Sequence, residues 1–188
     1  HSSKRLSPWV VVQEELAGTV FRVTVIGGKV TAVLRRDPPQ VIGNGTSTIA
    51  ELVATANLDP RRKGAVFHAI PLGSDATHEL KRQHVSLHSI PKKGQIVFLG
   101  EKIGRTSGGT NVDVTDSIHK DNIALFEKVA RVLDDPLVGI DCIMSDMSIP
   151  WQMQPRCGII ECNSMPFVDL HYQPFEGKKR NPANELWD

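Results

Sequence analysis

Gly27-Gly28 lies between two runs rich in β-branched and other apolar residues, 21–26 and 29–36. Consecutive glycines can both adopt the positive φ angles that a tight hairpin turn requires. The pair therefore predicts two antiparallel strands, and Pro38-Pro39 predicts the end of the second one. A hairpin this near the start of the sequence restricts the chain to folds that contain an antiparallel sheet.

Apolar periodicity predicts the remaining elements. Ser47 or Thr48 can cap a helix whose apolar positions recur at three- and four-residue steps. We also expect strands at 9–15, 95–99, 137–144 and 158–163, and helices at 76–85, 120–133 and, for one turn, from Pro182. The order of hairpin, helix, strand, helix and hairpin predicts an α+β fold, an antiparallel sheet with flanking helices.

The composition excludes several classes of function. Among 188 residues, 22 Lys and Arg against 21 Asp and Glu leave a net charge of +1, so charge favours neither nucleic acid nor an anionic membrane as a partner. The apolar runs are too short to span a bilayer, and the start lacks the apolar core of a signal peptide. Three cysteines without CxxC spacing predict reduced, buried thiols in a cytoplasmic protein.

Two strand-like runs each carry an isolated acidic residue, Asp141 and Glu161. Asn163 follows Glu161 by two positions, so both side chains share one face of a strand. If the two strands pair, Asp141 can join them in an oxygen-rich set suited to Mg²⁺. Carboxylates on core strands also require a nearby cation, so the equally good alternative is that they pair with Arg or Lys, or face water.

Two other stretches could contact an anion. Only one of the adjacent Arg35 and Arg36 can point into a given site, and a guanidinium group suits phosphate. The loop 106–110 is rich in small residues that let backbone amides approach an anion. A solvated strand end and an ordinary turn remain the alternatives. The clear helix carries no pair of histidines at zinc-binding spacing, so we expect no zinc.

Seven motifs occur in the order typical of the ATP-grasp superfamily. They are Gln13 to Val23, Gly27 to Val33, Val41 to Ile49, Asp59 to Arg62, Thr106 to Asp116, Gly139 to Asp141 and Ile160 to Pro166, and the match ends with His171 and 176–180. Within the superfamily the chain resembles the ligase domain of cyanophycin synthetase and, as a near relative, bacterial bifunctional glutathione synthetase.

The resemblance implies that residues 1–188 form the C-terminal portion of an ATP-grasp domain, with the central hinge strands and the C-terminal lobe. The N-terminal lobe, with its lysine strand and glycine flap, would lie outside this sequence. The implied activity is ATP-dependent ligation of a carboxylate to an amine through an acyl phosphate, acting on amino acids or peptides. The resemblance also leaves open the association of the protein with copies of itself in a homo-oligomer.

The resemblance also assigns roles by motif. Asp141, Glu161 and Asn163 match the ligands of Mg²⁺, with Mn²⁺ as an alternative ion. The adenine hinge corresponds to Gln13, Glu14 and Leu16, and Arg36 and Asn163 lie at the ATP phosphates. Arg36, Ser107 and Gly108 match positions near the transferred phosphoryl group.

Three positions depart from the family pattern. Val20 stands where an acidic residue usually holds the ribose, and Phe167 and Asp169 replace a Gly and an Arg beside the acyl-substrate site. These changes motivate a second hypothesis, a non-catalytic nucleotide-binding module of ATP-grasp fold. A metal-dependent phosphohydrolase is disfavoured, because no nucleophile or general base accompanies the carboxylates.

Overall fold

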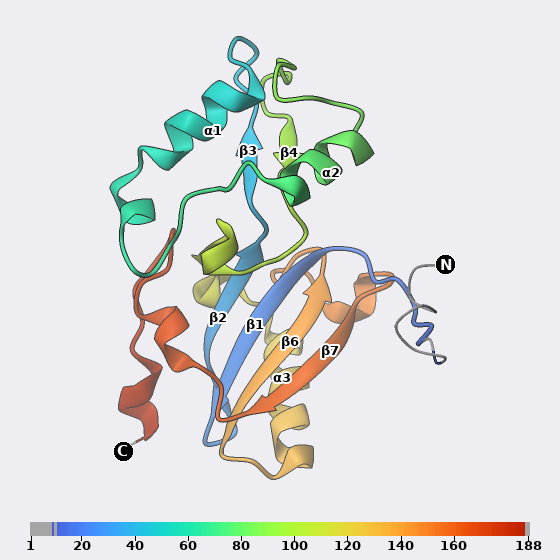
Figure 1. Cartoon of the computed structure of the whole chain (residues 1–188). Helices are drawn as coiled ribbons and strands as arrows, with labels where there is room; N and C mark the ends of the chain where they lie inside the picture. Colours follow the sequence, from blue (N-terminus) through green and yellow to red (C-terminus); the bar gives the residue numbers. More distant parts are fainter. Residues whose placement is uncertain (1–8, 10, 187–188) are drawn as a thin grey trace.

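A five-stranded antiparallel sheet forms the larger part of the molecule (Figure 1). The structure, a computed structural model, describes residue 9 and residues 11–186. The strand order is β5-β2-β1-β6-β7. The strands are β1 Thr19–Ile26, β2 Lys29–Asp37, β5 Thr110–Asp113, β6 Leu137–Met144 and β7 Gly158–Ser164. The sheet with its flanking helices confirms the α+β fold class.

The hairpin β1–β2 turns at Gly27 and Gly28, whose φ angles are +55° and +76°. The apolar positions of β1 and β6 alternate, so Val23, Ile140 and their neighbours face one side of the sheet. Helix α3, Lys120–Leu133, covers that side with Phe126 and Ala130 and closes the main core. Its bounds coincide with the predicted 120–133 helix, because an amphipathic pattern of that length is a strong signal.

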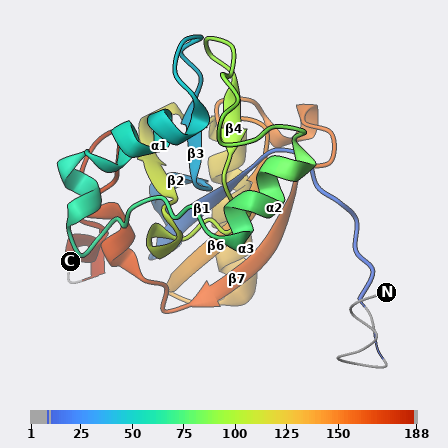
Figure 2. The same ribbon diagram turned by 45° about the horizontal axis from the view of Figure 1, so that its top comes forward.

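A smaller lobe lies at one end of the sheet and has its own core (Figure 2). It comprises β3 Gln40–Ile42, β4 Ile96–Phe98, α1 Ile49–Asn57 and α2 Ser74–Arg82. Thr48 caps α1, as predicted, and exchanges hydrogen bonds with Glu51 in a capping box. Ile49, Val53, Leu80 and Val97 meet between the helices and the two short strands.

Short 3₁₀ helices complete the structure: η2 Pro60–Lys63, η3 Arg105–Ser107, η4 Thr115–Ser117, η5 Trp151–Met153, η6 Val168–His171 and η7 Pro182–Leu186. The C-terminal segment with η6 and η7 lies beside β2 and reaches back to the small lobe (Figure 1). No helix in the described part of the chain has the length and apolar character needed to cross a membrane.

Several predictions of elements were wrong. The described residues of 9–15 form no strand; Val11 and Val12 are exposed, and an isolated extended segment has no ladder to stabilise it. Helix α2 ends at Arg82 rather than 85, because Val85 packs into the small-lobe core after the chain has left the helix.

The prediction that all three cysteines are buried was wrong as well. Of the three unpaired cysteines only Cys142 is buried; Cys162 is exposed on edge strand β7.

Candidate active site

A row of aligned residues crosses the face of the sheet opposite α3. Strand register places Asp113, Leu34, Arg22, Asp141 and Glu161 side by side, one from each strand. Residues in register on neighbouring strands project from the same face. The sheet therefore brings Asp141 and Glu161 together, as the strand periodicity predicted, and adds an arginine that the sequence analysis did not single out.

Arg22 is the cation that compensates Asp141. Its Nε and Nη2 atoms donate to Oδ1 and Oδ2 of Asp141, each at 2.7 Å, and both residues are buried. This bidentate fork engages both carboxylate oxygens, so the alternative of pairing with an arginine holds for Asp141. Each oxygen keeps a further lone pair for another partner. Glu161 is exposed beside the pair and makes no ion pair within the described chain.

Arg36 approaches the same carboxylate from β2. Its Nη1 lies 3.7 Å from Oδ1 of Asp141, and its Nη2 donates to the carbonyl oxygen of Ile103 at 3.3 Å. Burial lowers the pKa of Arg36, Asp141 raises it, and the nearby charges of Arg22 and Arg105 lower it further. Arg22 pairs with Asp141 and Arg105 pairs with Asp169, so Arg36, with its longer contact, is the guanidinium group of the three best able to meet an anion. Arg35 alternates to the other face of the sheet and pairs with Asp37, and both of these residues also line the cavity beside Arg36.

Asn163 lies opposite Gly139 on the neighbouring strand. A Cβ atom on Gly139 would come within 2.5 Å of the Cβ of Pro166 and 3.2 Å of Nη1 of Arg22. The absence of a side chain therefore lets the arginine lie across β6. A bulge directly after Asp141 shifts the register with β7, a feature that re-aims side chains near functional sites.

The oxygen set fits a magnesium ion, although the described residues contain no group of three or more His, Cys, Asp or Glu side chains placed to hold a metal. Mg²⁺ commonly takes one or two carboxylates and completes its shell with water and phosphate oxygens. Asp141, Glu161 and Asn163 share one face of neighbouring strands and would supply two carboxylates and an amide oxygen.

A cavity of about 500 Å³ opens beside Arg36. Val20, Ile103 and Phe98 contribute apolar walls to it. Its charged lining comprises Arg35, Arg36, Asp37 and Glu101. Gln13 and Glu14 are exposed in the extended segment before the cavity and do not line it, and Leu16 packs against Gly158. Their role at an adenine ring stays a prediction.

The loop 105–110, called the glycine loop from here on, packs closely against the small lobe. Gly108 has a φ of +85°, and a Cβ atom there would come within 2.7 Å of the Cα of Ile70. Ser107 ends η3 directly before it. From the same loop, Nη2 of Arg105 donates to Oδ2 of Asp169 at 2.9 Å, so the charge of Asp169 is paired. The loop and the segment after β7 are therefore joined over the candidate site.

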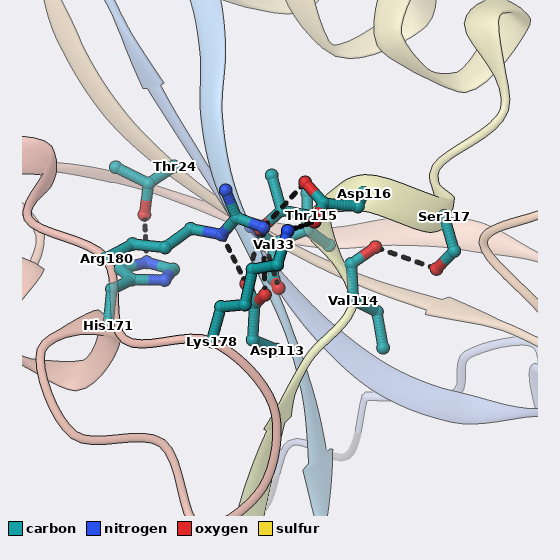
Figure 3. A network of polar contacts seen from close by, with 10 residues as sticks. All are labelled: Thr24, Val33, Asp113, Val114, Thr115, Asp116, Ser117, His171, Lys178 and Arg180. Carbon is teal, nitrogen blue, oxygen red and sulfur yellow. Dashed lines mark hydrogen bonds and ion pairs between the residues drawn. The ribbon is translucent and has the colours of Figure 1, made fainter.

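Buried polar contacts fix the C-terminal segment on this face (Figure 3). The hydroxyl of Thr24 and Nε2 of His171 form a hydrogen bond of 2.7 Å, and Nδ1 of His171 is buried without a hydrogen-bond partner among the described residues. Burial lowers the pKa of His171 to about 4. Arg180 donates to both oxygens of Asp113 and to Asp116, which also contacts Lys178.

Known proteins resemble this chain in sequence and in fold. Cyanophycin synthetase of Trichormus variabilis is 36% identical over 190 residues, which cover 100% of this chain and 21% of that protein. Glutathione biosynthesis bifunctional protein GshAB of Clostridium perfringens is 35% identical over 182 residues, covering 95% and 23%. The crystal structure of a bifunctional glutathione synthetase from Pasteurella multocida superposes with a TM-score of 0.75 at 31% identity, covering 92% of this chain and 24% of that one.

The chain is homologous to part of the ATP-grasp ligases. No protein-family model matches it. The chain spans about a fifth of the length of the relatives it matches. ATP-grasp ligases in general use ATP and Mg²⁺.

Within this ATP-grasp segment, sequence reasoning missed Arg22 and Arg105. For Arg22 a signal was available, since it is an isolated charge in the apolar run from Phe21 to Val25, like Asp141 in its own strand. For Arg105 there was none, because its partner Asp169 is 64 residues away in a different loop.

Proposed function

We propose that the full-length protein is an ATP-dependent carboxylate–amine ligase that binds Mg²⁺-ATP and forms an amide or peptide bond through an acyl phosphate. The observation that carries this proposal is the Arg22–Asp141–Glu161 row with Arg36, which lies beside the cavity of about 500 Å³. The homologous ligases support it in addition.

The proposal gives each group a physical task. Asp141, Glu161 and Asn163 would hold Mg²⁺, which neutralises phosphate charge when bound. Arg36 would contact a phosphate from the cavity side, since phosphoryl transfer depends mainly on positioning and charge neutralisation. Arg22 orients Asp141 by its fork. Ser107 and Gly108 would lie near the transferred group, although their backbone amides donate to the carbonyl oxygens of Gly104 and Arg105 within the loop.

The substrates belong to the same proposal. The names of the relatives point to amino acids or short peptides as acyl and amine substrates. The proposal places the reaction in the cytoplasm, in keeping with three unpaired cysteines. Asp169, which replaces an Arg beside the acyl-substrate site, forms an ion pair with Arg105, so its charge would not act alone on a substrate.

The test is phosphate release from ATP by the full-length protein, measured across a panel of amino acids and dipeptides as added acceptors. We expect release to require an acceptor, and Glu161→Gln to lower it by about 100-fold or more while the fold persists. Asp75→Asn, an exposed carboxylate on α2, is the matched control and should retain activity. ATP binding without acceptor-dependent release would instead indicate a non-catalytic nucleotide-binding module.

A further inference from the structure

Arg62 is a buried cation without a carboxylate partner. Its exposed fraction is 8%, and no Asp or Glu lies within ion-pair distance in the described residues. Nη1 donates to the carbonyl oxygens of His68 at 3.0 Å and Gly108 at 2.8 Å. Its other nitrogen atoms, Nε and Nη2, make no hydrogen bond to the part of the chain that the structure describes. The side chain therefore has donors left for a ligand.

This arrangement leaves positive charge uncompensated. Burial lowers the pKa of Arg62, and the more distant Asp59 raises it. Carbonyl oxygens accept from Nη1, and the centre of the Phe175 ring lies 4.9 Å from the guanidinium carbon. Nε and Nη2 are not among the buried polar atoms without a partner in the described residues, so they remain open to solvent. An anion next to Arg62 would offset this effect of burial on its charge.

A cavity adjoins the guanidinium group. It has a volume of about 610 Å³ and is lined by Thr55 and Ala56 of α1, by Asp59 and residues of η2, and by Phe175. Arg61 also lines it, but Asp59 already holds Arg61 in an ion pair, so the charge available to a ligand is that of Arg62. Its lining comes from the C-terminal segment, through Phe175, and from the small lobe, through Thr55 and Arg62. Figure 1 shows these two segments approaching each other.

We propose that this cavity is a subsite for an oxyanion, held by the guanidinium fork of Arg62 and bordered by the edge of Phe175. A planar fork with free donors suits carboxylate and phosphate groups. In the full-length ligase the occupant is a carboxylate of the amino-acid or peptide substrate other than the reacting one, and this step rests on the proposed function. The hydrogen bond from Arg62 to Gly108 links the subsite to the glycine loop.

The experiment measures thermal stability of the full-length protein against malonate, and separately against inorganic phosphate, at constant ionic strength. Thr55→Trp fills the cavity from α1 without removing a contact of Arg62, and Ala54→Trp places the same side chain on the exposed helix surface outside the cavity. Both variants keep the Arg22 and Arg36 site, so their difference reports the Arg62 cavity alone.

We expect malonate to raise the melting temperature of the wild type and of Ala54→Trp, and to bind Thr55→Trp about tenfold more weakly. Arg62→Gln should behave like Thr55→Trp. Stronger stabilisation by phosphate than by malonate, lost in the same variants, would keep the oxyanion site but overturn its assignment to a substrate carboxylate. Equal responses of the two Trp variants, or no response of the wild type, would overturn the subsite. The melting temperature does not depend on ligase activity. This experiment can therefore contradict the oxyanion subsite while the proposed ligase activity stands, and the phosphate-release assay can do the reverse.

Discussion

The fork between Arg22 and Asp141 is the contact on which the candidate site most depends. Both side chains are buried, so Arg22→Met leaves the Asp141 carboxylate with the longer contact to Arg36, at 3.7 Å, and should destabilise the chain by about 3 kcal/mol. Arg22→Met combined with Asp141→Leu should recover most of that loss, since an apolar pair of similar volume removes the buried charge. Urea unfolding followed by circular dichroism measures both values. A double variant no more stable than the single one would contradict this account.

His171 makes the stability of the fold depend on pH. Its pKa is about 4 in the folded chain against an ordinary 6.5, mainly because of burial, while Asp113 raises the pKa and Arg22 lowers it. Between these values the unfolded chain binds more protons, so the contribution of His171 falls as pH drops from 6.5 to 4, by about 3 kcal/mol in total.

The variant His171→Gln should remove this part of the pH dependence while keeping an amide for Thr24. His88→Gln, an exposed histidine of the small lobe, controls for loss of an imidazole. The measurement is the free energy of unfolding at several pH values from 4 to 7. Identical pH profiles for His171→Gln and the wild type would argue against a buried neutral imidazole.

Among the elements, Gly108 in the glycine loop can be compared with Gly28 in the β1–β2 turn, because both glycines have a positive φ. Gly108→Ala adds a Cβ atom within 2.7 Å of the Cα of Ile70, whereas Gly28→Ala meets nothing within 4 Å. Gly28→Ala should therefore cost about 1 kcal/mol of stability and spare turnover, and Gly108→Ala should cost more and reduce turnover by displacing the loop. Unfolding and phosphate-release assays on the full-length protein test both. Unchanged turnover in Gly108→Ala would remove this loop from the site.

The helices and strands also show which parts of the fold sequence patterns alone can predict. The hairpin at Gly27, α3 and the strands around Asp141 and Glu161 were predictable, because long apolar periodicities and a paired glycine turn act locally. Strands β3 and β5 were missed because each is short, is stabilised by a distant partner and lies next to a turn or glycine loop, whereas the equally short β4 was predicted from its apolar run. The shared face of Glu161 and Asn163 followed from strand geometry. The fork from Arg22 did not, because it depends on a pairing 119 residues apart.

At the scale of the molecule, the C-terminal segment joins the two cores. Asn111 on β5 accepts from the backbone of Phe175, and the Phe175 ring packs edge-on against Phe67 beside the small lobe. Arg180 anchors the same segment to Asp113, whose side chain is 5% exposed (Figure 3). Loss of this anchor should loosen the segment over the polar face of the sheet and so weaken the contact between the lobes.

Arg180→Gln tests that connection. It leaves the buried carboxylate of Asp113 with Thr115 as its remaining side-chain donor and should cost about 1.5 to 3 kcal/mol. Hydrogen exchange should quicken in residues 168–180 first, before the central strands respond. Lys178→Gln is the matched control, because Lys178 contacts only the exposed Asp116 in this network and a surface pair contributes less than about 1 kcal/mol. If Arg180→Gln and Lys178→Gln exchange alike, the segment is held by Asn111 and Phe175, and the two lobes communicate through packing rather than through charge.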